Sequence, residues 1–216
     1  MIARSAELEL LDVETPTRRE LDRLAGYFAF VNRWLGGLRA VAHRLREIPD
    51  ARVVLDVGAG TADLPRALAR RFPALRPVVL DRSVTFLARA ADLPRVLGDA
   101  RRLPFVAGSV DVVIATHLFH HLTDDEAVAA LREFDRIARR GIVVNDLLRR
   151  RRAVLWITIL TLFANRFAKF DGPLSVKRGF TLAEAEALAR RAGLAWLGVR
   201  EHFGHRFTLA GRRPRA

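Results

Sequence analysis

Hydrophobic residues gather in short runs along the middle of the chain, near residues 52–57, 77–81, 95–98, 110–116 and 141–145. Apolar residues at consecutive positions are typical of strands that are buried on both faces. Helical patterns near residues 62–72, 83–91 and 125–139 separate the runs. Because strands that alternate with helices form parallel sheets, we predict an α/β fold with helices on both faces.

Capping signals mark the starts of three helical segments, one of which is the segment near residues 125–139. A threonine is followed three residues later by a glutamate at Thr17 and Glu20, Thr123 and Glu126, and Thr181 and Glu184. In such a capping box, each side chain satisfies a free backbone N–H of the first turn. The first box predicts a helix that runs to about Leu35. Two glycines end this helix, and a second helix is predicted over residues 38–48. Residues 194–210 alternate enough to predict two final strands, paired antiparallel.

A length of 216 residues with 50% hydrophobic content fits one domain with one substantial core. We divide it into a helical cap (1–49), a ligand-binding core (50–147), an insertion that forms a lid or binds a substrate (148–180), and a last helix with strands (181–211). The chain has no cysteine. Disulfides and cysteine-ligated metals are thereby excluded, which is consistent with the cytoplasmic location that we expect.

The formal net charge is +13, and nearly all of the basic residues are arginines, since Lys169 and Lys177 are the only lysines. A basic surface can bind nucleic acid, and that alternative stays open. The arginines are also explained by an ordinary solvated surface, so we do not expect a nucleic-acid partner.

The stretch VLDVGAGTADLP, residues 54–65, indicates a strand, a tight turn and the start of a helix. A dinucleotide-binding turn would need a third glycine where Asp63 stands, and a phosphate-binding P-loop would need a lysine. Neither is present. The turn therefore fits the close approach of an uncharged part of a ligand, and the N–H groups at the helix start can hold a carboxylate.

Two acidic residues follow the next strands. Asp81 ends the run VVLD, where a carboxylate can accept both hydroxyls of a ribose, and Asp99 lies in LGDARRLPF, where it can accept an amino N–H of adenine. The ligand so described has an adenosine, an amino-acid carboxylate and little or no phosphate. These features indicate S-adenosyl-L-methionine.

Residues 50–147 resemble the class I S-adenosylmethionine-dependent methyltransferases in four ordered motifs: VLDVGAGTADLP, VVLDRS, GDARRLPF and VDVVIATHLFHHL. The resemblance implies a doubly wound, Rossmann-like fold whose mostly parallel, seven-stranded sheet has an antiparallel last strand. Another doubly wound enzyme with acidic strand ends is the alternative. The cofactor-binding residues implied by the resemblance are Asp56, Gly58, Ala59 and Gly60 at the methionine moiety, Asp81 at the ribose, Asp99 and Ala100 at the adenine, Arg82 along the adenine face, and Thr116 in the same pocket.

The flanking segments narrow the resemblance. GYFAFVNRWLGGLRAVAHRL is similar to the amino-terminal segment of ubiquinone/menaquinone-type methyltransferases, which implies that Tyr27, Asn32 and Arg39 help to close the pocket. The carboxyl-terminal side resembles bacterial enzymes of polyketide or isoprenoid-quinone pathways. Both resemblances imply a small-molecule acceptor.

Three histidines, His117, His120 and His121, follow the fourth strand, where the reactive methyl group should emerge. Histidine is suited to removing a proton near neutral pH. We favour His120 as the base, then His121, and place His117 at the acceptor; a structural cluster is the alternative. We predict no metal site, because residues 117 and 121 share one face only if this turn is helical, and because no acidic residue lies close to the histidines in the sequence except Asp124 and Asp125.

Asp146 ends the fifth strand on the ligand side of the sheet. We predict that it orients an acceptor hydroxyl or pairs with an arginine among residues 149–152, and we favour the ion pair. Asp171 and Ser175 flank a Gly-Pro pair that favours a loop, either a substrate wall or a plain turn.

Residues 153–164, AVLWITILTLFA, are apolar except for two threonines, and arginines precede and follow them. The segment is too short to span a bilayer, which needs about 20 residues. Three interpretations remain: a buried core helix, a lid over an apolar acceptor, or an interfacial helix through which residues 149–166 contact the inner membrane surface peripherally.

We therefore expect methyl transfer from S-adenosylmethionine to a hydrophobic phenolic, quinone-like or polyketide-derived small molecule. Transfer to oxygen is slightly favoured over transfer to carbon. The alternatives are an RNA or DNA methyltransferase that uses the basic surface, and a non-catalytic cofactor-binding protein at a membrane surface.

Overall fold

The computed structural model describes residues 2–214 and contains a seven-stranded sheet in the order β3-β2-β1-β4-β5-β7-β6. Its strands are β1 (Val53–Val57), β2 (Arg76–Asp81), β3 (Arg95–Leu97), β4 (Val110–Thr116), β5 (Ala138–Leu147), β6 (Gly198–His202) and β7 (Arg206–Arg212). Strands β1 to β5 run parallel, and β7 pairs antiparallel with β5 and β6. The predicted doubly wound α/β fold with an antiparallel last strand is confirmed.

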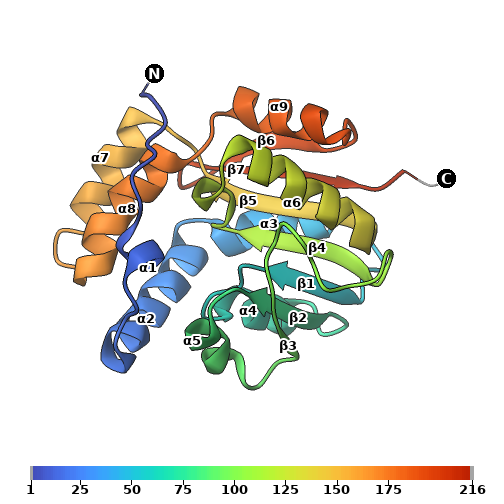
Figure 1. Cartoon of the computed structure of the whole chain (residues 1–216), viewed down its shortest axis with the longest axis horizontal. Coiled ribbons are helices and arrows are strands. Elements are labelled where there is room, and N and C mark those ends of the chain that lie inside the picture. Colours follow the sequence, from blue (N-terminus) through green and yellow to red (C-terminus); the bar gives the residue numbers. More distant parts are fainter. Residues whose placement is uncertain (1, 215–216) are drawn as a thin grey trace.

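Helices cover both faces of the sheet, with α6 and α9 on one face and α3 and α4 on the other (Figure 1). The helices are α1 (Leu10–Val13), α2 (Arg18–Trp34), α3 (Gly37–Leu45), α4 (Asp63–Arg71), α5 (Val84–Leu87), α6 (Asp124–Ile137), α7 (Arg151–Leu160), α8 (Arg166–Arg178) and α9 (Leu182–Ala192), with short 3-10 turns η1 (Ala88–Ala90) and η2 (Phe119–His121). All three predicted capping boxes are present, at the starts of α2, α6 and α9.

The hydrophobic runs fill two cores, one on each face of the sheet. Leu55 and Val57 of β1 pack into the core beneath α6 and α9, whereas Val54 packs into the core beneath α3 and α4. Successive strand residues point to opposite faces, so a strand covered by helices on both sides must be apolar throughout. This is the pattern from which the buried strands were predicted.

Several boundaries differ from the prediction. The helix expected over residues 125–139 ends at Ile137, and β5 begins at Ala138 without a loop, so β5 is longer than the expected 141–145. Residues 138–140 have good helix propensity, but pairing of Ala138 with Val110 draws them into the sheet. The helix expected over residues 83–91 is divided into α5 and the turn η1.

The prediction of a loop around the Gly-Pro pair is wrong, because α8 continues through Pro173. Proline removes one helical hydrogen bond and usually ends a helix. Here Asn165 caps the first turn, and Phe167 and Leu174 are buried on the inner side of the helix. Tertiary packing therefore outweighs the local signal.

Of the three interpretations of residues 153–164, the structure contradicts the buried core helix. Within α7 only Ala153 is buried, while most of the apolar side chains on this helix are exposed. The helix packs on α8 at the margin of the molecule (Figure 1). Among residues 2–214, no helix combines the length and the apolar composition needed to cross a bilayer.

Candidate functional site

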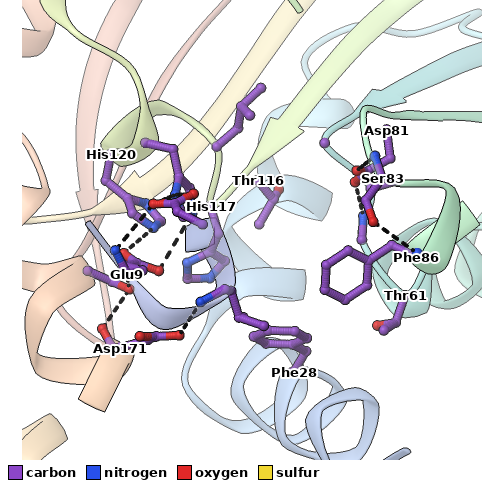
Figure 2. A pocket seen from close by; sticks show the side chains of 18 of the residues that line it. Glu9, Phe28, Thr61, Asp81, Ser83, Phe86, Thr116, His117, His120 and Asp171 are labelled. Carbon is purple, nitrogen blue, oxygen red and sulfur yellow. Dashed lines mark hydrogen bonds and ion pairs between the residues drawn. The ribbon is translucent and has the colours of Figure 1, made fainter. Parts of the chain in front are cut away.

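The carboxyl ends of β1, β2 and β4 meet at one edge of the sheet and open into a cavity of about 380 Å³. The amino-terminal segment, α2 and α8 cover this edge. Figure 2 shows Asp81 and Ser83 at one side of the cavity, Glu9 and His120 at the other, and Thr116 between them. The cavity thus has two ends with different chemistry.

The glycine-containing turn after β1 forms one wall of the cavity. Gly58 and Gly60 have φ angles of +71° and +52°, a region that side chains with a Cβ rarely adopt. A Cβ at Gly58 would lie 3.0 Å from the side chain of Leu118, whereas a Cβ at Gly60 would meet no atom within 4 Å. The backbone at Gly60, and that of Ala59 beside it in the cavity wall, can therefore approach a ligand closely.

Asp81 is held beside this turn in a defined orientation. Its Oδ2 accepts a hydrogen bond from the Gly60 N–H at 2.8 Å, and its Oδ1 accepts one from the Ser83 N–H at 2.8 Å. Burial raises the pKa of Asp81, and these two backbone hydrogen bonds oppose the shift. Each carboxylate oxygen keeps a further lone pair for a hydroxyl in the cavity.

Three buried polar atoms of cavity-lining residues have no hydrogen-bond partner among the described residues: Asp56 Oδ1, Thr116 Oγ1 and Asn32 Oδ1. Burial raises the pKa of Asp56 well above its usual value, and the neighbouring Asp63 and Asp81 raise it further. Buried polar groups are normally paired, so the unpaired oxygens of Asp56 and Thr116 are candidates for contact with a polar ligand, whereas Asn32 Oδ1 lies against Gly37.

Asp99, Ala100 and Arg82 line the same end, as expected from the motifs. The Asp99 carboxylate accepts hydrogen bonds from the side chain of Arg101, which hold its pKa below the usual value. The Arg82 guanidinium lies 3.0 Å from Asp12 of the amino-terminal segment and is mostly exposed. Arg82 therefore connects the amino-terminal segment to the end of the cavity that Asp81 lines.

His120 and Asp146 form a buried pair at the other end. His120 Nδ1 lies 2.7 Å from Asp146 Oδ1, and Asp146 Oδ2 accepts hydrogen bonds from the backbone N–H groups of Phe119 and His120. Burial alone would raise the pKa of Asp146, but the charge and the side-chain hydrogen bond of His120, with smaller effects of His117 and the Leu147 N–H, outweigh it and hold the pKa well below the usual value. The ionised carboxylate fixes the imidazole with its Nδ1–H toward Asp146.

The two predicted roles for Asp146 need correction. Asp146 is fully buried behind His120 and does not line the cavity, and it pairs with no arginine among residues 149–152. Arg149 and Arg150 instead pair with Glu184 and Glu201. The carboxylate of Asp146 faces the ring Nδ1 of His120 and accepts hydrogen bonds from the backbone N–H groups of Phe119 and His120 in η2.

The amino-terminal segment brings an acidic residue to the histidines that the sequence did not single out. Glu9 Oε1 lies 3.5 Å from His120 Nε2, and Glu9 Oε2 lies 3.8 Å from His121 Nε2. Burial raises the pKa of Glu9 to about 7. Asp12 lies 3.2 Å from His121 Nδ1 and 2.8 Å from Arg178 Nη1. More than 100 residues separate Glu9 from the histidines, so no local motif indicates the contact.

His117 has a structural contact as well as a place in the cavity wall. Its φ of +56° is rare for a residue other than glycine, and its Nε2 lies 2.6 Å from Nη1 of the buried Arg206. Burial and the charge of Arg206 lower the pKa of His117 well below its usual value. His117 is therefore a neutral acceptor for the guanidinium N–H.

Much of the remaining cavity wall is apolar. The amino-terminal segment, α2, α7 and α8 contribute these side chains to it: Leu11, Leu24, Tyr27, Phe28, Val31, Ile157 and Phe167. Tyr27 and Asn32 line the cavity as predicted, but the prediction for Arg39 is wrong. Arg39 lies on the outer side of α3, is exposed and does not line the cavity.

The corrected α8 also places Asp171 and Ser175 differently from the predicted loop. Both line the cavity from one side of the helix. Asp171 accepts hydrogen bonds from the N–H groups of Leu10 and Leu11, and the Ser175 hydroxyl donates to Glu9 Oε1 at 2.8 Å. Together they anchor the amino-terminal segment over the end of the cavity that Glu9 and His120 line.

Residues 54–141 match a family model described as a methyltransferase domain. A demethylmenaquinone methyltransferase of Thermotoga maritima is 32% identical over 142 residues, which cover 60% of this chain and 61% of the relative. The matched segments thus span less than two thirds of the length of such curated relatives.

Solved structures of methyltransferases share the fold. The S-adenosylmethionine-dependent methyltransferase SibL superimposes with a TM-score of 0.66 at 21% identity and covers 95% of this chain and 65% of its own. The plantazolicin methyltransferase BpumL, solved in complex with SAH, gives a TM-score of 0.66 at 14% identity, with coverage of 87% and 74%.

Proposed function

From the premise that this chain carries, in residues 54–141, a methyltransferase domain of the class I S-adenosylmethionine-dependent type, we propose that it methylates a hydrophobic small molecule. The observation that carries the proposal is the single cavity with two chemically distinct ends. One end offers the glycine turn and Asp81; the other offers His120, backed by Asp146, among apolar side chains.

The residues of the first end fit S-adenosyl-L-methionine. When bound, this cofactor supplies a methyl group activated by a sulfonium. Asp81 holds the ribose hydroxyls, the backbone around Gly60 approaches the methionine moiety, and Asp99 lies at the adenine. The unpaired Oδ1 of Asp56 and Oγ1 of Thr116 receive polar partners from the ligand.

His120 acts on the acceptor at the second end. Its Nδ1–H stays on Asp146, so Nε2 is the basic nitrogen and faces Glu9 and the cavity. An acceptor hydroxyl that enters beside Glu9 transfers its proton to Nε2, and the ionised Asp146 stabilises the imidazolium that results. His121, held by Asp12, is the second candidate for this role.

The acceptor is a phenolic, quinone-like or polyketide-derived molecule. The apolar wall formed by Leu24, Phe28 and Phe167 suits a flat hydrophobic ring, and the nearby histidine suits a ring that bears a hydroxyl. The demethylmenaquinone methyltransferase named above supports a quinone-like ring. Transfer to oxygen is favoured slightly over transfer to a ring carbon, because a single base beside the acceptor hydroxyl can remove its proton directly.

The experiment measures transfer of a labelled methyl group from S-adenosylmethionine to a panel of phenols and hydroquinones, with transfer RNA and double-stranded DNA as further acceptors. Turnover of a phenol or hydroquinone that is lost in His120→Ala, while cofactor binding is kept, supports the proposal. Methylation of nucleic acid alone contradicts it.

A further inference from the structure

Helix α7 has two faces of opposite exposure. Ala153, Ile157 and Thr161 form the inner face, in which Ile157 lines the cavity and both Ile157 and Thr161 lie against Gly172 of α8. On the outer face, the exposed fractions are 63% for Trp156 and 100% for Phe163, which follows the helix. The side that faces solvent is therefore strongly apolar.

The apolar side chains of the outer face form one stripe. Leu155, Trp156, Ile159 and Leu160 follow the i, i+4 spacing that places residues on one side of a helix, and Phe163 follows in the turn after α7; all five are at least 44% exposed. Soluble proteins rarely expose such a contiguous apolar stripe unless it binds something.

The charges near the stripe indicate what kind of surface binds to it. Residues 147–170 contain six basic residues and no acidic one, and three of the six, Arg149, Arg150 and Arg166, pair with acidic residues of other segments. Arg151 and Arg152, one turn before Leu155 and Trp156, are exposed and form no salt bridge with an acidic residue within 2–214. A second copy of the chain would bring these like charges together, whereas anionic lipid headgroups would neutralise them.

We propose that the outer face of α7 docks on an anionic lipid bilayer. Trp156 and Phe163 enter the region between headgroups and acyl chains, and Arg151 and Arg152 contact the headgroups. Because Ile157 on the inner face of α7 lines the cavity, docking of the outer face places this apolar part of the cavity wall close to the lipid. The proposal does not rest on the methyltransferase activity, since cofactor and acceptor take no part in the contact.

Co-flotation with vesicles of phosphatidylglycerol and phosphatidylcholine tests the proposal, with pure phosphatidylcholine vesicles for comparison. The full chain binds the mixed vesicles, and binding falls as salt rises. The double variant Trp156→Ser with Phe163→Ser weakens apparent vesicle affinity by at least about tenfold. Arg151→Glu with Arg152→Glu weakens it by about fivefold or more for each arginine.

Matched control variants change similar residues elsewhere. Val84→Ser with Val106→Ser removes two exposed apolar side chains, and Arg70→Glu with Arg71→Glu reverses two exposed arginines of α4. Both controls keep vesicle binding. Unchanged thermal unfolding of the α7 variants shows that they fold.

Three results overturn the proposal: no flotation of the wild type, equal flotation of the Trp156→Ser, Phe163→Ser variant, or equal loss in the controls. Sedimentation velocity addresses the competing occupant. A dimer that Trp156→Ser with Phe163→Ser dissociates, without vesicle binding, shows that the stripe joins two copies of the chain.

Discussion

Replacing Asp146 with asparagine tests how the chain orients its proposed base. The variant keeps the size of the side chain and an oxygen for the backbone N–H groups of Phe119 and His120, but it removes the charge beside His120 Nδ1. A hydrogen bond to a charged group contributes about 1.5–3 kcal/mol, and this one strengthens as the imidazole takes a proton. Asp146→Asn should therefore lower kcat/KM by about 10- to 100-fold, since about 1.4 kcal/mol corresponds to a factor of ten.

The control is Asp111→Asn. Asp111 is also a buried aspartate of the sheet and accepts hydrogen bonds from the backbone N–H groups of Arg52 and Val53, but it lies outside the cavity lining. Urea unfolding should show a loss of stability in both variants, while titration calorimetry should show unchanged cofactor binding. The reasoning is refuted if Asp146→Asn keeps kcat/KM within about twofold of the wild type, or if Asp111→Asn lowers it equally.

Three further predictions concern the cofactor end and the amino-terminal segment. Asp81→Asn should weaken S-adenosylmethionine binding by about tenfold or more, because it removes a charged acceptor; an unchanged dissociation constant in calorimetry would argue against the ribose contact. Gly58→Ala should destabilise the fold by about 1–2 kcal/mol in urea unfolding, because alanine disfavours positive φ and its Cβ would press on Leu118. Glu9 has a pKa of about 7 in the folded chain and 4.5 in the unfolded chain, so the folded state binds the proton of Glu9 more tightly. Protonated Glu9 therefore stabilises the fold below pH 4.5, and this stabilisation is lost as the pH rises to about 7. The loss amounts to about 3 kcal/mol and should be absent in Glu9→Gln; equal changes of unfolding free energy between pH 4.5 and 8 in both proteins would refute the assignment.

The cofactor end could be predicted from sequence because its determinants are local. Gly58, Gly60 and Asp81 lie at strand ends, and the carboxyl ends of neighbouring parallel strands must meet at one edge of the sheet. The hydrophobic runs predict those strands, so position along the chain already indicates position in space. All nine predicted cofactor-binding residues line the cavity.

The acceptor end depends on contacts between distant segments. Glu9 and Asp12 reach the histidines only because Asp171 and Ser175 of α8 hold the amino-terminal segment there. No spacing in the sequence reports such a contact. The prediction of a loop around Gly172 was wrong for the same reason, because the packing of the buried side of α8 outweighs the turn preference of a Gly-Pro pair.

The exposure of α7 could not be predicted from its composition. An apolar run of about 12 residues fits a core helix, a lid or an interfacial helix equally well, and periodicity alone does not separate them. The structure excludes the core, because Trp156 and Phe163 face solvent. Which face of α7 meets the cavity and which is exposed depends on its packing against α8, and no local pattern reports that contact.

Titration calorimetry of S-adenosylmethionine into the wild-type chain and the Asp81→Asn variant tests the central claim most directly. The account predicts saturable binding at one site in the wild type and weaker binding in the variant, at a temperature at which thermal unfolding shows both proteins to be folded. Absence of binding to the wild type up to about 1 mM cofactor, the upper range of ordinary enzyme affinities, would contradict it.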